Sequence, residues 1–89
     1  MDLQEIRQQI DSVDKELVQL FCKRMNLSAQ VADFKKANNM PIYVPAREQE
    51  ILQKVAKIAD SELEESIQTL YATIFQLSRE YQSKRNQSD

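Results

Sequence analysis

Two basic residues on one face of the N-terminal helical stretch could bind an anion. Arg24 occupies the single polar position of an otherwise apolar helical face, and Lys35 follows eleven residues later. In a helix that spacing is about three turns, or roughly 16 Å, and returns to nearly the same face. An arginine binds a carboxylate through two parallel hydrogen bonds, so the two cations could hold a small dianion. The alternative is structural: Arg24 snorkels or pairs with a glutamate, and Lys35 is a solvated lysine at a helix end.

Four more polar residues could add to such a site. Arg47 and Glu48 lie in the first turn of a second predicted helix, where a carboxylate is favourable. Ser78 and Gln82 are four residues apart in a third predicted helix, so they share a face. Each of them alone is typical of an exposed turn or a polar boundary. Taken together with the two cations, they form a pattern that chance does not readily explain.

Composition excludes several other kinds of chemistry. The 89 residues contain no histidine, which removes His-based triads and His-metal sites. The single Cys22 cannot form an internal disulfide, and we expect it to be a half-buried, inert thiol in a reducing cytoplasm. The net charge of -2 argues against a nucleic-acid surface. The polar N-terminus and the lack of a long apolar run predict neither a signal peptide nor a membrane partner.

The N-terminal stretch is predicted to be one long helix, residues 2 to about 38. It contains no proline or glycine, Asp2 and Glu5 form a capping box at its start, and two asparagines followed by Pro41 end it. Such a helix is about 55 Å long, whereas a compact monomer of this size is roughly 30 Å across. A second copy of the chain is therefore expected to cover its apolar face, the apolar stripe, which consists of Leu3, Ile6, Ile10, Val13, Leu17, Leu20, Leu27, Val31 and Phe34.

Two shorter helices are predicted to follow. One begins at Pro45 and stops near residues 59–60. A capping box over residues 61–64 opens the other, and the polar residues 83–89 are expected to be frayed. Apolar residues recur on one face of each helix. The sequence thus predicts a single all-α domain over residues 1–89, with one long N-terminal helix and two shorter ones.

Several short patterns recur at spacings typical of one enzyme family. An arginine followed by Ile-Asp-x-hydrophobic-Asp occupies residues 7–14, and the later patterns are Arg24, Val31-Ala32-x-Phe34-Lys35, Pro41-Ile42, Arg47-Glu48 and Ser78-x-x-x-Gln82. Over residues 6–82 the chain resembles the all-helical class of chorismate mutases. The resemblance implies a [3,3] rearrangement of chorismate to prephenate in phenylalanine and tyrosine biosynthesis. It also implies an intertwined helical homodimer with shared active sites, and a reaction that needs no nucleophile, cofactor or metal.

The resemblance also assigns the catalytic groups. Arg24 and Arg7 would bind the two carboxylates of chorismate, and Lys35 and Gln82 would donate hydrogen bonds to its ether oxygen. The enzyme must hold the enolpyruvyl ether folded over the ring. It must also stabilise the negative charge that grows on the ether oxygen as the C–O bond breaks. Lys35, Gln82 and Arg24 are therefore the predicted catalytic residues.

Further positions are predicted to bind the substrate. By the same resemblance, Glu48 would hold the ring hydroxyl with Arg47 supporting it, and Ser78 would contact the ring carboxylate. The family often has an aspartate where this chain has Val44, which can keep only a backbone contact and is a poor N-cap. We expect this difference to weaken binding modestly rather than to abolish activity.

The position of Arg7 bears on the oligomeric state. Along a straight helix it is about 42 Å from Lys35, too far for one substituted ring to touch both. If Arg7 belongs to the site, it comes from the partner chain. An antiparallel pairing that sets it between Arg24 and Lys35 then puts the two-fold axis near Val18, in an apolar stretch.

Two other functions stay open from the sequence. One is a pyruvate-eliminating lyase on the same fold that acts on isochorismate, although Arg47 and Glu48 favour the mutase. The other is a helical dimerisation module without catalytic activity. A module of that kind predicts ordinary core residues where Arg24 and Gln82 stand, and it leaves a buried arginine without a partner.

Overall fold

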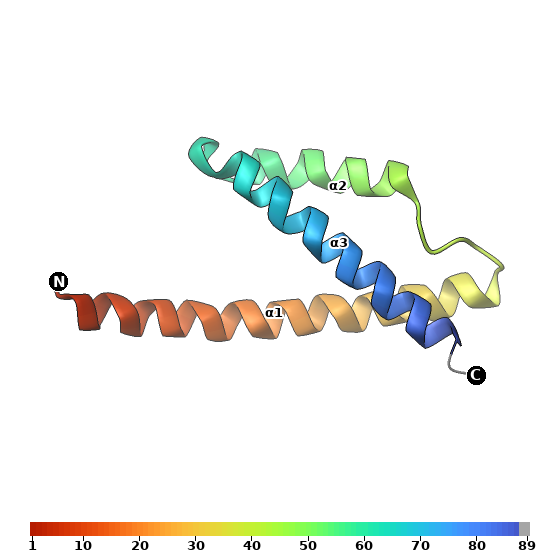
Figure 1. The fold of residues 1–89 in the computed structure, drawn as a ribbon, viewed down its shortest axis with the longest axis horizontal. Helices are drawn as coiled ribbons and strands as arrows, with labels where there is room; N and C mark the ends of the chain where they lie inside the picture. The colour runs from red at the N-terminus through yellow and green to blue at the C-terminus, as the bar shows by residue number, and fades with distance from the viewer. Residues whose placement is uncertain (88–89) are drawn as a thin grey trace.

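The computed structural model describes residues 1–87, which form three α-helices and one short 3-10 turn (Figure 1). The helices are α1 (Leu3–Ala37), α2 (Pro45–Ile58) and α3 (Glu64–Gln87), and the turn η1 (Ser61–Leu63) lies between the last two. The described residues contain no strand. The predicted all-α arrangement of one long and two shorter helices is confirmed.

Both ends of α1 are capped at the residues that the sequence indicates, although only the Asp2 half of the predicted capping box forms. At the start, Asp2 Oδ1 accepts a hydrogen bond of 2.8 Å from the backbone N–H of Glu5. At the end, Asn39 adopts a left-handed conformation with φ of 54°. Its N–H donates to the carbonyl of Lys36 at 3.4 Å, and the N–H of Met40 donates to the carbonyl of Lys35 at 2.8 Å. This pair of bonds is a Schellman motif, and it turns the chain back toward α1.

Two local predictions about α3 are wrong. Ser61 does not cap this helix, because residues 61–63 form the 3-10 turn, in which the N–H of Leu63 donates to the carbonyl of Asp60 at 2.8 Å. Residues 83–87 were expected to be frayed, but they are helical, since α3 continues to residue 87. Arg85 pairs there with Asp33 of α1 at 2.8 Å, which ties the last turn of α3 to α1. Residues 88 and 89 lie outside the described part of the chain.

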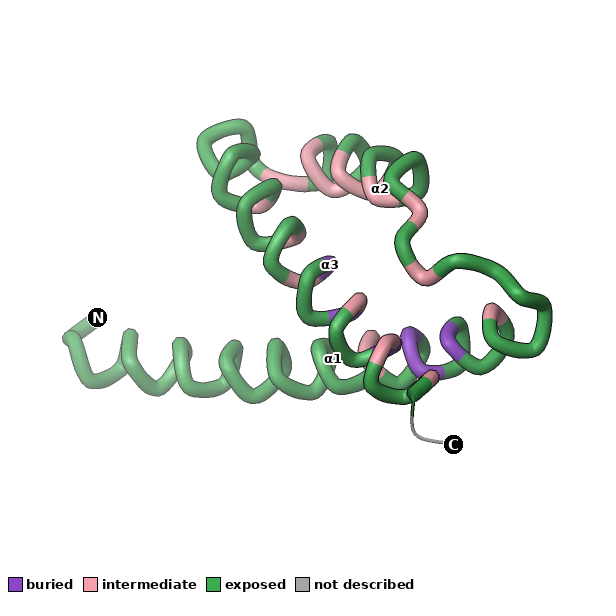
Figure 2. Tube along the Cα trace, turned by 45° about the vertical axis from the view of Figure 1, so that its right-hand side comes forward, coloured by how far each residue is buried: buried purple, intermediate pink, exposed green. Residues whose placement is uncertain are grey.

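The helices leave half of α1 uncovered. Helix α3 packs against the C-terminal half of α1 and against α2, while the N-terminal half of α1 extends beyond both (Figure 1). Residues 1–23 are all exposed, including Cys22, which was expected to be half-buried (Figure 2). The molecule measures 54 × 27 × 14 Å with a radius of gyration of 16.2 Å. A compact domain of this length has a radius near 12 Å, so the predicted overhang is confirmed.

The described part of the single chain buries very little apolar surface. The apolar residues that it buries are Ala29, Ala32 and Phe75, where α1 and α3 cross. Every residue of the apolar stripe is exposed in the single chain. No helix within residues 1–87 is both long and apolar enough to cross a membrane.

Candidate active site

A cavity of about 330 Å³ lies between the C-terminal halves of α1 and α3 and the start of α2. Seven of the eight predicted site residues line it, contributed by all three helices and the α1–α2 connection. They are Arg24, Lys35, Val44, Arg47, Glu48, Ser78 and Gln82. The remaining wall contains Ser28 and apolar side chains, namely Leu27, Val31, Ile42, Ile51 and Phe75.

The eighth predicted residue, Arg7, is far from this cavity. It lies in the exposed N-terminal half of α1 and does not line the cavity. Seventeen residues separate it from Arg24, which is about 25 Å along the helix. A single chain therefore does not bring Arg7 to the other site residues.

Arg24 is half-buried against aromatic rings. Its Cζ atom lies 5.8 Å from the ring centroids of both Tyr71 and Phe75, which pack edge to face with centroids 6.0 Å apart. These cation–π contacts offset part of the cost of removing the guanidinium from water. No carboxylate within residues 1–87 pairs with Arg24. The guanidinium is therefore a cation available to an anion in the cavity.

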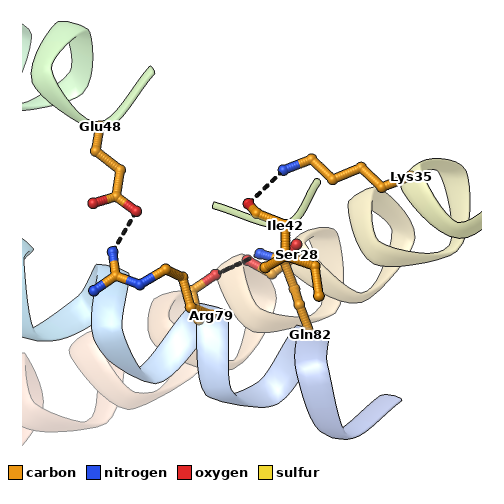
Figure 3. Close-up of polar contacts among 7 residues, drawn as sticks. Ser28, Lys35, Ile42, Glu48, Arg79 and Gln82 are labelled. Carbon is orange, nitrogen blue, oxygen red and sulfur yellow. Dashed lines mark hydrogen bonds and ion pairs between the residues drawn. The ribbon is translucent and has the colours of Figure 1, made fainter. Parts of the chain in front are cut away.

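Lys35 is held at the rim of the cavity by the end of α1. Its Nζ atom donates a hydrogen bond of 2.8 Å to the carbonyl of Ile42 (Figure 3). The Schellman motif returns the connection toward α1, and this places the Ile42 carbonyl within reach of the lysine. The ammonium has three donors, so two of them remain for a ligand.

Glu48 pairs with a residue that the sequence analysis missed. Its Oε2 atom accepts from Nη1 of Arg79 on α3 (Figure 3). The guanidinium of Arg79 also lies 4.8 Å from the ring centroid of Tyr43. Arg47 was expected to support Glu48, but its Nη1 instead contacts Glu50 Oε1 at 2.8 Å in an exposed pair. The available signal was the position of Arg79, three residues before Gln82 on α3.

Ser78 and Gln82 belong to a buried chain of hydrogen bonds. Gln82 Nε2 donates to Ser78 Oγ at 3.1 Å, and Ser78 Oγ donates to Ser28 Oγ on α1 at 2.9 Å. The Oε1 atom of Gln82 is buried and has no hydrogen-bond partner. Ser28 was not among the predicted site residues. Its place four residues after Arg24 on the same helical face is the signal that points to it.

Val44 precedes α2 and supplies no side-chain cap, as expected of a valine at this position. Its carbonyl accepts from the N–H of Arg47 at 3.1 Å and from that of Glu48 at 3.3 Å. No side-chain hydrogen bond caps α2. The start of α2 therefore relies on Pro45 and on these backbone bonds alone.

Comparison with known proteins gives the family. The model of the family described as chorismate mutase type II matches residues 6–83, and the chain belongs to this family. No solved structure matches significantly.

Similar curated proteins carry related names. The chain is 49% identical over 51 residues to the T-protein of Haemophilus influenzae, a match that covers 57% of this chain and 14% of that protein. It is 37% identical over 57 residues to the bifunctional chorismate mutase/prephenate dehydratase of Aquifex aeolicus, covering 64% and 16% of the two chains. It is 36% identical over 56 residues to the chorismate mutase of Methanocaldococcus jannaschii, covering 63% and 57%. The match thus spans a small part of the two longer relatives.

Proposed function

We propose that this chain converts chorismate to prephenate in the cytoplasm, as a step of phenylalanine and tyrosine biosynthesis. The observation that carries the proposal is the cavity, which is lined by seven positions of the family pattern, among them Arg24, with which no described carboxylate pairs. Charge supports it as well. The charge of Glu48 is balanced by Arg79 and that of Arg47 by Glu50, while Arg24 and Lys35 also line the cavity, so a dianion enters a site of net positive charge.

The chemistry asks for binding and electrostatics only. One C–O bond breaks and one C–C bond forms within the same molecule, with no proton transferred. Arg24 binds one carboxylate, and the apolar wall with Phe75 holds the side chain of the substrate folded over its ring. Lys35 and Gln82 donate to the ether oxygen as negative charge develops on it. Glu48 accepts a hydrogen bond from the ring hydroxyl, and Ser78 lies beside the ring carboxylate.

The working form in this proposal is an intertwined homodimer. Between α1 and α3 lies a second, apolar groove of about 490 Å³, lined by Leu17, Val18, Leu70 and Leu77 among others. Arg24 lines both this groove and the polar cavity. A second copy in antiparallel orientation covers the groove and the exposed apolar stripe. It also supplies its own Arg7 to the second carboxylate of the substrate.

The non-enzymatic dimerisation module is the weaker reading. It gives no reason why one cavity is lined both by Arg24, with which no described carboxylate pairs, and by Gln82, whose buried Oε1 has no hydrogen-bond partner in the structure. Both features cost stability in an unliganded protein. A ligand with carboxylates and oxygen acceptors removes both costs.

A direct assay separates mutase from lyase. The purified chain is incubated with chorismate or with isochorismate, and prephenate and pyruvate are measured in each reaction. The proposal predicts loss of chorismate absorbance with prephenate as the product, and at most slow pyruvate release from isochorismate. Pyruvate release that is faster than prephenate formation would favour the lyase, and no turnover of either substrate would favour the module.

A further inference from the structure

Three buried polar side chains connect α1 to α3 beside the cavity. Ser28 is 8% exposed, Ser78 6% and Gln82 7%, and they are the buried polar residues of the described chain. Gln82 donates to Ser78 at 3.1 Å, and Ser78 donates to Ser28 at 2.9 Å. All three line the cavity. The direction of these hydrogen bonds therefore decides which atom of the Gln82 amide is left for a ligand.

In this structure the amide presents an acceptor toward the cavity. Nε2 of Gln82 is used by Ser78, and Oε1 is buried without a partner. A buried polar atom left unpaired costs free energy, so a ligand that pairs with this end of the amide is favoured. An ether oxygen has lone pairs but no hydrogen. It cannot pair with Oε1 and requires Nε2 in that place.

The same series of hydrogen bonds can run in the opposite direction. A hydroxyl both donates and accepts, and rotation of the amide by 180° exchanges its oxygen and nitrogen. In the reversed direction Ser28 donates to Ser78, and Ser78 donates to Oε1 of Gln82. Both hydrogen bonds are kept, and Nε2 then has free N–H groups at the cavity.

We propose that Ser28 is a positioning residue whose hydroxyl, by donating to Ser78, holds the Gln82 amide with Nε2 toward the bound substrate. The inference rests on the proposed mutase function. It adds that the hydrogen bonds among Ser28, Ser78 and Gln82 reverse their direction when substrate binds. Without Ser28, the hydroxyl of Ser78 receives no hydrogen bond in the reversed direction. The Ser78 hydroxyl is then as free to accept from Nε2 as to donate to Oε1, so its bond no longer favours one orientation of the amide.

The first test removes the hydroxyl. Ser28→Ala is expected to fold, because alanine is smaller than serine and favours a helix. The loss of one buried hydrogen bond predicts a fall in kcat/KM of roughly three- to tenfold, mainly in kcat. Ser66→Ala removes an exposed serine of α3 outside the cavity and is the matched control, expected to match the parent. A lower melting temperature of Ser28→Ala with unchanged kcat/KM would make the bond purely structural and overturn the proposal.

The second test asks whether Ser28 acts through Gln82. In Gln82→Glu at a pH low enough to protonate the new carboxyl group, either oxygen can carry the proton, so no orientation is needed. Adding Ser28→Ala to this variant is then expected to change kcat/KM by roughly twofold or less. The comparison is the effect of Ser28→Ala on the parent enzyme at the same pH. An equal fall in both backgrounds would mean that Ser28 acts independently of Gln82. If turnover of Gln82→Glu is too slow to follow, the same four variants are compared by their Kd for prephenate. The keto oxygen of prephenate is the former ether oxygen of chorismate, so it occupies the position that Gln82 is proposed to contact.

The two levels of the proposal fail differently. If the parent chain does not convert chorismate to prephenate, the proposed function is wrong. If the parent is active and Ser28→Ala retains its full kcat/KM, only the role of Ser28 is wrong.

Discussion

The carboxylate of Glu48 depends on Arg79 for both its orientation and its charge balance. The two side chains are partly buried, with exposed fractions of 21% and 33%, and Arg79 also stacks over Tyr43. A lone carboxylate at this edge of the cavity repels a dianionic substrate. Paired with Arg79, it can accept from a hydroxyl group without adding net negative charge.

The first prediction concerns this pair. Arg79→Gln leaves Glu48 without its cation, so we expect KM for chorismate to rise on the order of tenfold, with a smaller change in kcat. The matched control is Arg85→Gln, which breaks another arginine–carboxylate pair of α3 outside the cavity and is expected to keep the parent KM. Steady-state kinetics of both variants decides the matter. Equal KM values for the two would remove Arg79 from any role in binding.

A second prediction tests Gln82 as the donor to the ether oxygen. The amide does not titrate, so it gives the parent no reason to lose kcat/KM between mildly acidic and mildly alkaline pH. Gln82→Glu can donate only when its carboxyl group is protonated. As pH rises, we expect its kcat/KM to fall by on the order of 100-fold or more, the cost of a lost oxyanion donor. A pH profile as flat as that of the parent, with folding checked at each pH, would place Gln82 elsewhere.

At the level of the helices, sequence patterns predicted what local chemistry determines. Asp2 caps α1, Pro45 opens α2, and Asn39 ends α1 in the left-handed conformation. One error arose where a contact between distant residues intervenes. The last turns of α3 are polar and were expected to fray, but Arg85 contacts Asp33, 52 residues earlier in the chain. Nothing in the local sequence of α3 reveals that partner.

The candidate site could be predicted only in part from the sequence. Family spacing indicated the seven residues that line the cavity. Arg79 and Ser28 were missed because their roles come from contacts between helices, with Glu48 of α2 and with Ser78 of α3. The resemblance assigned Arg47 to support Glu48, its neighbour in the sequence. Successive residues of a helix point about 100° apart, and its partner is three residues on at position 50.

A third prediction tests the tie between α1 and α3. The hydrogen bond from Arg85, followed by its positive charge, lowers the pKa of Asp33 below its ordinary value of 3.8. The folded state therefore binds this proton less tightly than the unfolded state. The stabilisation is present above pH 3.8 and is lost as pH falls through the lower, folded-state pKa.

The measurement for this pair is the melting temperature as a function of pH. Asp33→Asn should melt below the parent at neutral pH, and the difference should vanish under acid conditions. Arg85→Gln should behave in the same way. The double variant should lose no more than either single one. A difference that persists unchanged at low pH would contradict an electrostatic tie.

The molecule as a whole has too little core for a single chain to be stable alone. Residues 1–87 bury three apolar residues, and a domain of this small size often needs support from oligomerisation or a similar constraint. The exposed apolar stripe and the groove beside Val18 are the surfaces that a second copy covers in the proposed dimer. Activity and association are then inseparable.

A fourth prediction follows for the interface. Val18 is 62% exposed in the single chain and lies at the proposed two-fold axis. Val18→Lys places two like charges against each other there, so we expect dissociation and loss of activity. Gln19→Lys adds the same charge one position further, on a different face of α1, and is expected to remain dimeric and active. Sedimentation velocity measures the oligomeric state of both variants, and the chorismate assay measures their activity. An active dimer of Val18→Lys would exclude this pairing.

The most direct test of the shared site mixes two inactive variants. Arg7→Ala and Arg24→Ala should each fold and each lack activity, since every site of either homodimer lacks one guanidinium. After subunit exchange, a mixed dimer has one site with both lesions and one site with neither. We predict that activity returns on mixing, to about a quarter of the parent value when exchange is complete and statistical. If exchange is verified with tagged chains and no activity appears, Arg7 and Arg24 do not meet across two chains, and the proposed active site is wrong.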